Sequence, residues 1–462
     1  MTSSTRSEPT ASPFSSDPNT LLDLAIGHAP QDWAPAIAPG SHLDRSGFRF
    51  LHRPLLLPAH TVRQFGEDLR AITRLLMALP RRRYGDNVGA ASDAVGQDHA
   101  KRDLIDRYSA RPVPAFGRVD AYHDGTGLKI MEFNASSSAG GLDWASALVG
   151  AYRQQPRFAE FAREHGLHAV DIVDEITAAL CAYWTNAHPD GDPTGLRVAL
   201  VEGAGGVAAF GDSWQRLAEQ FTERGLNASL VELPDLDVSA DGVRLHGERV
   251  DVIYRLFDLG QAAATPQQSA AASALREAHE AGAVLIWTPF EAELHRHKVW
   301  LARLWDRAGS ALSDEEFELV QRVLPWTVEV TASTPAEQPT LWERLRDDQH
   351  NLVIKPGDGF GGVGIIFGWR VARVEWLAAL ERLAQTGGIV QERVPPRAEP
   401  IRDPATGEIG EWDACWGLFW TPDGFGGGGA RLVPRGESLA IPRERKRMTA
   451  LFSYDETRAD TW

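Results

Sequence analysis

The chain has 462 residues and a formal net charge of −16 at pH 7. That length exceeds what one ordinary core accommodates and predicts about two or three cooperating domains. The acidic balance argues against nucleic acid as the main partner. No run of about eighteen apolar residues is present, so we expect no contact with a membrane through a spanning helix.

Residues 1–20 are rich in Ser, Thr and Pro and lack the apolar core of a signal peptide, which predicts a disordered tail. Cys181 and Cys415 lie far apart in apolar surroundings, so each is expected to be a buried, reduced thiol. A cytoplasmic location follows from these two expectations.

Helices are predicted on either side of a central hairpin. Residues 60–80 carry apolar side chains at three- and four-residue spacing, typical of an amphipathic helix that Pro80 would end. A second helix is expected over 98–110, and residues 143–186 should be largely helical with breaks at Gln155-Pro156 and near Gly166.

The hairpin itself is predicted from two alternating segments, Gly117 to His123 and Leu128 to Phe133, joined by a glycine-containing turn. Asp120 lies on its first strand, while Glu132 and Asn134 lie two residues apart at the end of the second. All three side chains are expected on one face, because side chains in a strand alternate between faces.

These residue types suit Mg²⁺, which takes oxygen ligands from one or two carboxylates and others from nucleotide phosphates. Arg118 should share the face and could neutralise phosphate charge. Ser136, Ser137 and Ser138 follow directly and offer further donors. The alternative is a surface hairpin with scattered charges, and the hairpin alone does not decide between the two.

Strands and helices alternate between residues 195 and 292, which predicts a small parallel α/β sheet with helical crossovers. Its first turn contains Gly203-x-Gly205-x-x-Ala208, a variant of the dinucleotide-binding fingerprint. Nicotinamide or flavin binding there is one alternative, and a turn without a nucleotide is the other. The expected elements are strands Arg197–Val201, Ala228–Glu232, Val250–Arg255 and Ala283–Trp287, and helices Ser213–Arg224 and Gln267–Glu280.

A glycine-rich segment follows a strand that ends at Lys355. Because the β-rich Ile365 to Trp369 comes next instead of a helix, a Walker loop or Rossmann turn is not expected. The glycines should cap a β-hairpin and fold over phosphates as a lid, with Lys355 at its base. The lid residues are Gly359, Phe360, Gly361, Gly362 and Gly364.

Three further features complete the candidate site. Lys298 begins a helix, where it could also be a surface lysine lying over a tryptophan. The short strand Ile389 to Arg393 would bring Gln391 and Glu392 to a hinge beside adenine and ribose. Gly426 to Gly429 are expected to form a flexible loop or a lid over a second substrate.

A strand lysine, a glycine-rich lid, a Gln-Glu hinge and an Asp facing Glu-x-Asn together resemble the ATP-grasp nucleotide site. In an ordinary ATP-grasp enzyme the acidic residues follow the lysines, whereas here they precede Lys355 by more than two hundred residues. From about residue 110 to about 445, the chain therefore resembles the circularly permuted ATP-grasp group, in particular the synthetase domain of glutathionylspermidine synthase. The similar motifs are Arg118-Val-Asp120, Met131-Glu132-Phe133-Asn134, Val252-Ile-Tyr254-Arg255, His297-Lys298, Val353-Ile-Lys355-Pro356 and Val390-Gln391-Glu392.

The resemblance implies an α/β (α+β) chain: a permuted ATP-grasp fold with an inserted Rossmann-like parallel α/β preATP-grasp domain. The implied divisions are a disordered tail over 1–20, a metal-binding ATP-grasp portion over 21–190, the Rossmann-like domain over 195–292, the lysine and lid portion over 293–450, and a tail over 451–462.

The resemblance also implies roles for single residues. Asp120, Glu132 and Asn134 would bind two Mg²⁺ ions on the ATP phosphates, and Arg118 would steady the γ-phosphoryl group. Lys298 and Lys355 would hold the α and β phosphates, Gly359 to Gly364 would close as the lid, and Gln391 with Glu392 would receive the adenosine. Possible substrate-binding residues are Ser136, Ser137, Ser138, Arg255, Gly426 and Gly427.

The implied reaction joins a small-molecule carboxylate to an amine through an acyl phosphate, with ADP as product. The lid lacks the charged residues of glutathionylspermidine synthases, and no amidase domain is present, so neither glutathione nor spermidine is assigned. An oxidoreductase that uses the Gly203 to Ala208 turn and a catalytically inactive nucleotide-binding scaffold are the alternatives.

Overall fold

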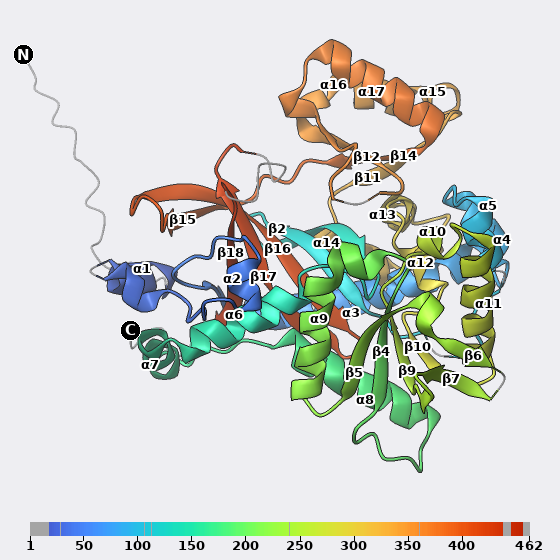
Figure 1. Ribbon diagram of the computed structural model, residues 1–462. Coiled ribbons are helices and arrows are strands. Elements are labelled where there is room, and N and C mark those ends of the chain that lie inside the picture. The colour runs from blue at the N-terminus through green and yellow to red at the C-terminus, as the bar shows by residue number, and fades with distance from the viewer. Residues whose placement is uncertain are drawn as a thin grey trace, which may run out of the picture.

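The computed structural model describes residues 18–27, 29–105, 107–111, 113–239, 241–359, 361–437 and 445–455. These residues form a mixed α/β structure with several sheets. Figure 1 shows the largest sheet in the middle of the molecule, a parallel sheet beside it, and a smaller lobe standing above both.

The largest sheet joins strands from the two ends of the chain in the order β1-β18-β17-β16-β2-β3, with β15 paired to β16. The predicted hairpin is confirmed as β2 (Gly117–His123) and β3 (Leu128–Asn134), and β2 also pairs antiparallel with β16. The other strands are β1 (Leu55–Pro58), β15 (Ala398–Arg402), β16 (Ile409–Thr421), β17 (Gly424–Pro434) and β18 (Arg447–Tyr454).

Each expected tail includes residues that the structure places in a helix or a strand. Residues 18–20 begin helix α1 (Pro18–Ile26), whereas 1–17 lie outside the described residues. Residues 451–454 belong to β18, which pairs with β1 and β17 and is buried over most of its length. The apolar sequence of β18 places it inside the sheet, so this part of the tail prediction is wrong.

Gly426 to Gly429 form neither a loop nor a lid, because they lie within β17, where Gly428 and Gly429 pair with β16 and the register shifts next to them. Neighbouring atoms explain the glycines. A Cβ at Gly426 would lie 2.7 Å from Ile172 Cδ1, and one at Gly429 would lie 3.0 Å from the Trp144 ring. The glycines therefore let helix side chains approach the sheet closely, which corrects the expected role of Gly426 and Gly427.

The second sheet is parallel, as predicted, with the order β10-β9-β4-β5. Helix α9 (Gly206–Glu223) begins earlier than the expected Ser213. A three-stranded sheet of β6 (Asp237–Ser239), β7 (Gly242–Leu245) and β8 (Glu248–Arg249) was not predicted. The parallel strands and remaining helices are β4 (Arg197–Glu202), β5 (Asn227–Glu232), β9 (Val252–Arg255), β10 (Leu285–Trp287), α10 (Leu259–Ala262) and α11 (Pro266–Glu280).

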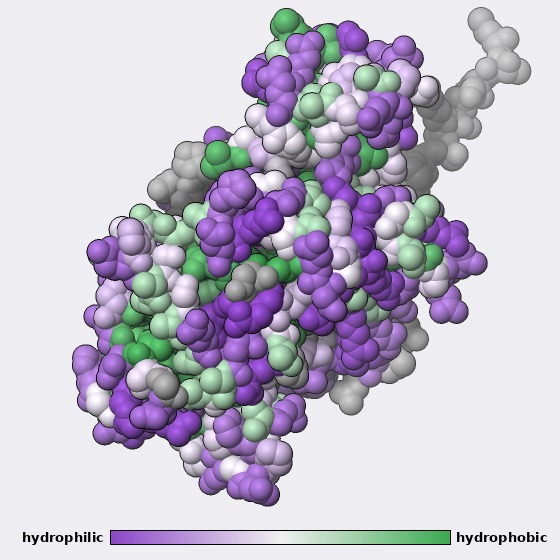
Figure 2. All heavy atoms as spheres, turned by 90° about the vertical axis from the view of Figure 1, so that its right-hand side faces the viewer, coloured by the Kyte–Doolittle hydropathy of each residue, from purple (hydrophilic) through white to green (hydrophobic). Residues whose placement is uncertain are grey.

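The lobe at the top of Figure 1 is built on an antiparallel sheet in the order β11-β14-β12-β13. β12 (Leu352–Pro356) pairs with β13 (Ile366–Phe367), so the predicted glycine-capped hairpin forms with a shorter second strand. Figure 2 shows the same lobe rising from the body, with hydrophilic residues covering much of this face. Its other elements are β11 (Thr327–Val330), β14 (Gly388–Glu392), α15 (Thr334–Glu337), α16 (Pro339–Asp347) and α17 (Arg373–Thr386).

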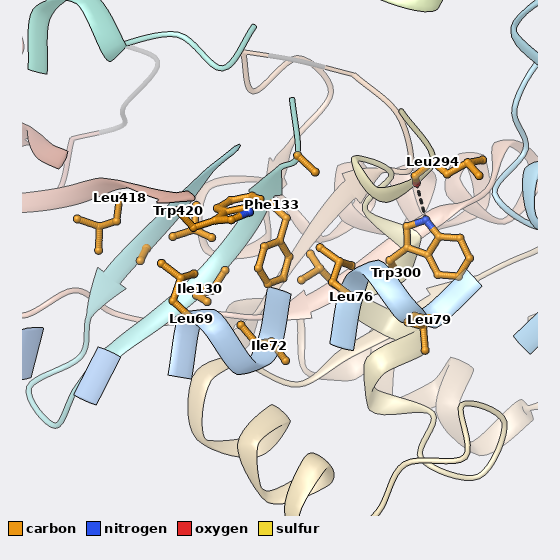
Figure 3. Packing of buried hydrophobic residues seen from close by; sticks show 14 of the residues in the cluster. Leu69, Ile72, Leu76, Leu79, Ile130, Phe133, Leu294, Trp300, Leu418 and Trp420 are labelled. Carbon is orange, nitrogen blue, oxygen red and sulfur yellow. Dashed lines mark hydrogen bonds between the residues drawn. The ribbon is translucent and has the colours of Figure 1, made fainter. Parts of the chain in front are cut away.

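Helix α3 (Ala59–Tyr84) packs against the back of the β2–β3 hairpin, and Figure 3 shows Leu69 near Ile130 and Leu76 near Phe133. The helix continues past Pro80, where it was expected to end. Leu79 and Pro80 are both buried, so packing outweighs the backbone hydrogen bond that proline cannot donate.

The remaining helices cover these sheets. The predicted break at Gln155-Pro156 separates α6 (Leu142–Gln154) from α7 (Pro156–Glu164). The helix expected over 98–110 is only α5 (His99–Leu104). In the described part of the chain, no helix has the length and apolar character needed to cross a membrane. The others are α2 (His42–Arg45), α4 (Val88–Ala94), α8 (Ile172–Ala187), α12 (Ala292–His295), α13 (Val299–Trp305) and α14 (Asp314–Val323).

Replacement of Phe133 by Ala should destabilise the core behind the hairpin. The Phe133 ring is buried and meets the Trp420 ring edge-on at 6.0 Å between centroids. Its loss should lower the free energy of unfolding by about 3–5 kcal/mol, measured by urea denaturation. Phe210→Ala is the control, because that ring is 59% exposed; equal losses in both variants would contradict the packing described.

Candidate functional site

The partly exposed face of the β2–β3 hairpin carries the predicted polar residues together. Arg118 pairs with Asn134 and Asp120 pairs with Glu132, after which the register shifts and leaves Met131 without a partner in β2. This bulge keeps Glu132 and Asn134 on the polar face while Phe133 remains buried. It also frees the Met131 carbonyl for another partner.

Lys355 provides that partner. Its ammonium donates to the Met131 carbonyl at 2.9 Å and to Gln391 Oε1 at 2.6 Å, and the residue is only 6% exposed. The hairpin and Lys355 are 224 residues apart along the chain. The structure thus brings together the acidic hairpin and the strand lysine that the sequence keeps apart.

Lys298 forms a second bridge between the two segments. It lies directly before α13, and its ammonium is 3.2 Å from Glu132 Oε1 and donates to the Gly359 carbonyl at 2.8 Å. The side chain is buried, so the interpretation as an exposed surface lysine is wrong. Glu132, Lys298 and the start of the glycine-rich segment therefore meet at one point.

Asp120 is held between two guanidinium groups. Arg118 Nε donates to Asp120 Oδ1 at 2.8 Å, and Arg431 Nη2 donates to Oδ2 at 2.7 Å. Burial opposes ionisation of Asp120, but the two arginines outweigh it and lower the pKa to about 2. Arg431 was not predicted, because no motif marks it in β17.

The cysteines differ from each other. Cys415 lies on β16 with its Sγ 3.6 Å from Arg431 Nη2, and burial raises the pKa of its thiol to about 11. Both cysteines are free thiols, as expected, but Cys181 is only partly buried. A thiol with a raised pKa is a poor nucleophile, so Cys415 is a structural residue in this site.

The glycine-rich segment uses backbone conformations that favour glycine. Gly359, Gly361, Gly362 and Gly364 have positive φ values of 123°, 64°, 78° and 77°. No atom would meet a Cβ within 4 Å at the first three, so backbone conformation, not crowding, requires glycine there. Phe360 lies outside the described residues.

The two hinge residues take different positions. Gln391 is buried, binding Lys355 through its oxygen and donating to Thr327 Oγ1 at 3.1 Å. Its side chain is therefore engaged by Lys355 and Thr327 inside the protein. Glu392, at the end of β14, is exposed and remains the hinge residue open to a ligand.

Two of the predicted substrate-binding residues are structural. Arg255 is fully buried, with Nη1 2.9 Å from Glu293 Oε1 and Nε donating to the Thr288 carbonyl at 2.8 Å. Ser137 is also buried and bonds to the Arg255 carbonyl and to Thr288 Oγ1. These contacts fasten the segment after the hairpin to the parallel sheet and leave neither side chain open to a substrate.

Ser136 and Ser138 contact each other, with their hydroxyl oxygens 2.8 Å apart. A cavity of about 490 Å³ opens beside the hairpin and is lined by Arg118, Arg431, Gly140 and Trp144, among others. The cavity adjoins Asp120 through its two arginines, so a molecule within it would reach the polar face of the hairpin.

The donor set on the hairpin fits Mg²⁺. Among the residues that the structure describes, no three His, Cys, Asp or Glu side chains gather closely enough to hold a metal. The hairpin instead offers the carboxylates of Asp120 and Glu132 and the amide oxygen of Asn134, which share its polar face. Two carboxylates with one amide match an ion that takes its remaining ligands from phosphates and water.

Backbone N–H groups of the Gly203 to Ala208 turn already donate to carboxylates of the protein. The N–H groups of Gly205 and Val207 donate to Glu232 at 2.9 Å and 3.1 Å, and that of Gly203 donates to Glu202 at 3.1 Å. A dinucleotide would place its pyrophosphate on such N–H groups. Here the same groups are satisfied by the protein, and the carboxylates would repel an anion.

No protein-family model matches this chain, and no curated protein matches its sequence. Among solved structures, a glutathione synthetase-like effector from Globodera pallida has a TM-score of 0.55 at 14% identity, covering 95% of this chain and 98% of its own. A protein assigned as a gamma-glutamylcysteine synthetase from Methylobacillus flagellatus has a TM-score of 0.45 at 15% identity, covering 86% and 89%. A D-alanyl-alanine synthetase A from Vibrio cholerae has a TM-score of 0.30 at 11% identity, covering 55% and 74%.

The first of these likenesses extends over both chains and shows that the two proteins share a fold. None of the three is named a glutathionylspermidine synthase. Similarity to that enzyme therefore stays a prediction from the motifs of the sequence.

The buried position of Lys355 should make stability depend on alkaline pH. Burial lowers the pKa of Lys355 to about 8 from 10.5, so between these values the unfolded chain holds more protons on this residue. The unfolding free energy of the wild type should rise relative to Lys355→Met across this window, by up to about 3 kcal/mol. Urea unfolding of both proteins at each pH measures the difference, and a constant difference would contradict the burial of the ammonium.

Proposed function

We propose that this protein is an ATP-dependent carboxylate–amine ligase with a circularly permuted ATP-grasp fold. The observation that carries the proposal is the contact of 2.9 Å between the Lys355 ammonium and the Met131 carbonyl. The contact brings Lys355 next to the residue before Glu132, which supports a role for both side chains on one triphosphate. The fold shared with a glutathione synthetase-like effector agrees with this class of reaction.

The division of the chain supports a permuted arrangement. β2 and β3 precede the lysines in sequence but pair into the same sheet as β16, β17 and β18 near the C-terminus. In this proposal the ATP-grasp unit is assembled from residues 21–190 and 293–450. The parallel sheet of residues 195–292 is the inserted Rossmann-like domain.

The hairpin residues Asp120, Glu132 and Asn134 would hold Mg²⁺, two ions in the ATP-grasp pattern. Bound there, Mg²⁺ supplies neutralisation of phosphate charge and orientation of the triphosphate. Lys298 and Lys355 add two positive charges at the same place, and Arg118 faces the cavity in which the acid would lie. Glu392 at the exposed end of β14 would bind the ribose.

The reaction proceeds in two substitutions. A carboxylate oxygen of the acid attacks the γ-phosphorus, the bond to the β,γ-bridging oxygen breaks, and ADP leaves with the electron pair. The amine nitrogen then attacks the acyl carbon, phosphate leaves, and the nitrogen loses a proton to give the amide. Positioning and charge neutralisation supply the rate, so no protein nucleophile is required.

An oxidoreductase is the rival class, and the carboxylates of Glu202 and Glu232 weigh against it. Both acids are bonded to the N–H groups that a pyrophosphate would need. The ligase should bind ADP with Mg²⁺ and not NADPH. A scaffold without activity would bind ADP but release no phosphate from ATP.

Glu132→Gln and Lys355→Met should each weaken binding of ADP with Mg²⁺ at least 100-fold, which corresponds to about 2.8 kcal/mol. Glu132→Gln removes a metal-binding carboxylate, and Lys355→Met removes a phosphate-binding charge. Isothermal titration calorimetry measures both. Lys129→Met, on the same hairpin, is the matched control because its ammonium binds the Arg322 carbonyl; wild-type affinity in both site variants would refute the site.

Activity requires a second measurement, because neither substrate is identified. The wild type is incubated with ATP, Mg²⁺ and pools of amino acids and polyamines, and phosphate release is followed. We expect release that depends on a carboxylate and an amine together, and that Lys355→Met abolishes. A mass spectrum of the coupled product would identify both substrates, whereas ADP binding without any release would support the inactive scaffold.

A further inference from the structure

The wall of the cavity beside the hairpin contains a histidine paired with a carboxylate, His42 and Asp143. His42 Nε2 lies 2.5 Å from Asp143 Oδ2, and the two side chains are only 11% and 6% exposed. His42 is the first residue of α2 and Asp143 the second residue of α6, and α2 packs against both α6 and α9 (Figure 1). The surrounding helices therefore fix the position of the pair.

The contact with Asp143 determines which nitrogen of the His42 ring is free. An ionised carboxylate only accepts hydrogen bonds, so in a neutral imidazole it is Nε2 that carries the proton and donates to Asp143. Asp143 lies in the first turn of α6, where the helix dipole favours a negative charge. Among the residues that the structure describes, none forms a hydrogen bond with Nδ1 of His42. Nδ1 thus keeps a lone pair, as in a general base that a carboxylate orients.

The charges that face His42 suit both partners of an amide-forming reaction. The cations in the cavity lining suit an anionic acyl phosphate, whereas the exposed Asp212 suits the ammonium form of an amine. On the other side of the ring, the charged residues pair with one another. The cations of the cavity are Arg45, Arg118, Arg431 and Lys446, and the residues on the other side are Asp171, Arg216, Glu219, Glu223 and Arg224.

A short stretch of backbone connects the pair to the hairpin. Arg118, which also holds Asp120, donates through Nη1 to the Gly140 carbonyl. Gly141 is the N-cap residue of α6, and Asp143 follows two residues later. His42 and Arg118 line the same cavity, so a molecule held by the arginine lies in the space that the imidazole borders.

We propose that His42 is the general base that accepts the proton of the attacking amine, and that Asp143 positions it. This inference rests on the proposed ligase function. The amine nitrogen forms its bond to the acyl carbon, the bond from that carbon to the phosphate oxygen breaks, and phosphate leaves with the electron pair. The proton of the nitrogen passes to Nδ1 of His42, and Asp143 stabilises the imidazolium until water takes the proton.

The test compares two nucleophiles. Hydroxylamine is a much weaker base than an aliphatic amine, so it is unprotonated at neutral pH and attacks an acyl phosphate without a protein base. The protein is incubated with ATP, Mg²⁺ and a pool of amino acids, together with either hydroxylamine or a pool of polyamines. Hydroxamates are measured by the colour of their iron(III) complexes, and amides by mass spectrometry.

His42→Gln retains a nitrogen that can donate to Asp143 but has no basic atom. The ratio of amide to hydroxamate should fall at least about 100-fold in this variant. Asp143→Asn removes the charge that orients the ring and should lower the same ratio at least about tenfold. His350→Gln is the matched control, because His350 is exposed two residues before β12; it should keep the wild-type ratio.

The outcomes separate this inference from the ligase proposal. Equal losses of amide and hydroxamate in His42→Gln would show that the pair only supports the fold, and would overturn the assignment of a general base. A wild-type ratio in both site variants would overturn it as well. A wild type that binds ADP with Mg²⁺ but forms no hydroxamate would contradict the ligase, and this inference with it.

Discussion

Charge balance at the hairpin is the constraint on which the site depends. Lys298 and Lys355, both buried, and the guanidinium groups of Arg118 and Arg431 converge on a face that carries only the carboxylates of Asp120 and Glu132. Burial disfavours an ammonium without a full set of partners, and the pKa of Lys355 falls accordingly. Four cationic side chains thus face two carboxylates, which leaves this face with an excess of positive charge.

Rigid packing keeps this cluster in place. The apolar face of the hairpin rests on α3, and the bulge at Met131 exposes one backbone carbonyl to Lys355. In a regular ladder the Met131 carbonyl would be hydrogen-bonded to β2. The side chains that follow Met131 would then point to the opposite faces of the sheet. The sheet irregularity thus sets both the lysine contact and the direction of Glu132.

Much of the fold followed from local patterns in the sequence. The β2–β3 hairpin, the parallel sheet and the break before Pro156 depend on periodicity and on turn residues, which neighbouring residues determine. The continuation of the helix past Pro80 and the strand through Gly426 to Gly429 could not be predicted from local patterns. Each depends on packing against segments that are distant in the sequence. Trp144 and Ile172 explain those glycines, and neither is near them in sequence.

The candidate site was predictable to a similar extent. Asp120, Glu132 and Lys355 could be placed from motif spacing, since strands and alternation fix which residues share a face. Arg431 has no motif and is found only through its contact with Asp120. Gln391 was expected beside adenine and Arg255 beside a substrate, but their side chains bind Lys355 and Glu293 instead.

The pairing of β2 with β16 also has a consequence for biosynthesis. β3 ends at residue 134 and β16 begins at residue 409, so the ribosome adds 274 residues before the hairpin can meet its neighbour. At about 5–20 residues per second this takes roughly 14–55 s. Helix α3 is synthesised before the hairpin and can cover the apolar face of the hairpin during this time. The polar face of the hairpin and Arg431 of β17 therefore come together only late in the synthesis of these residues.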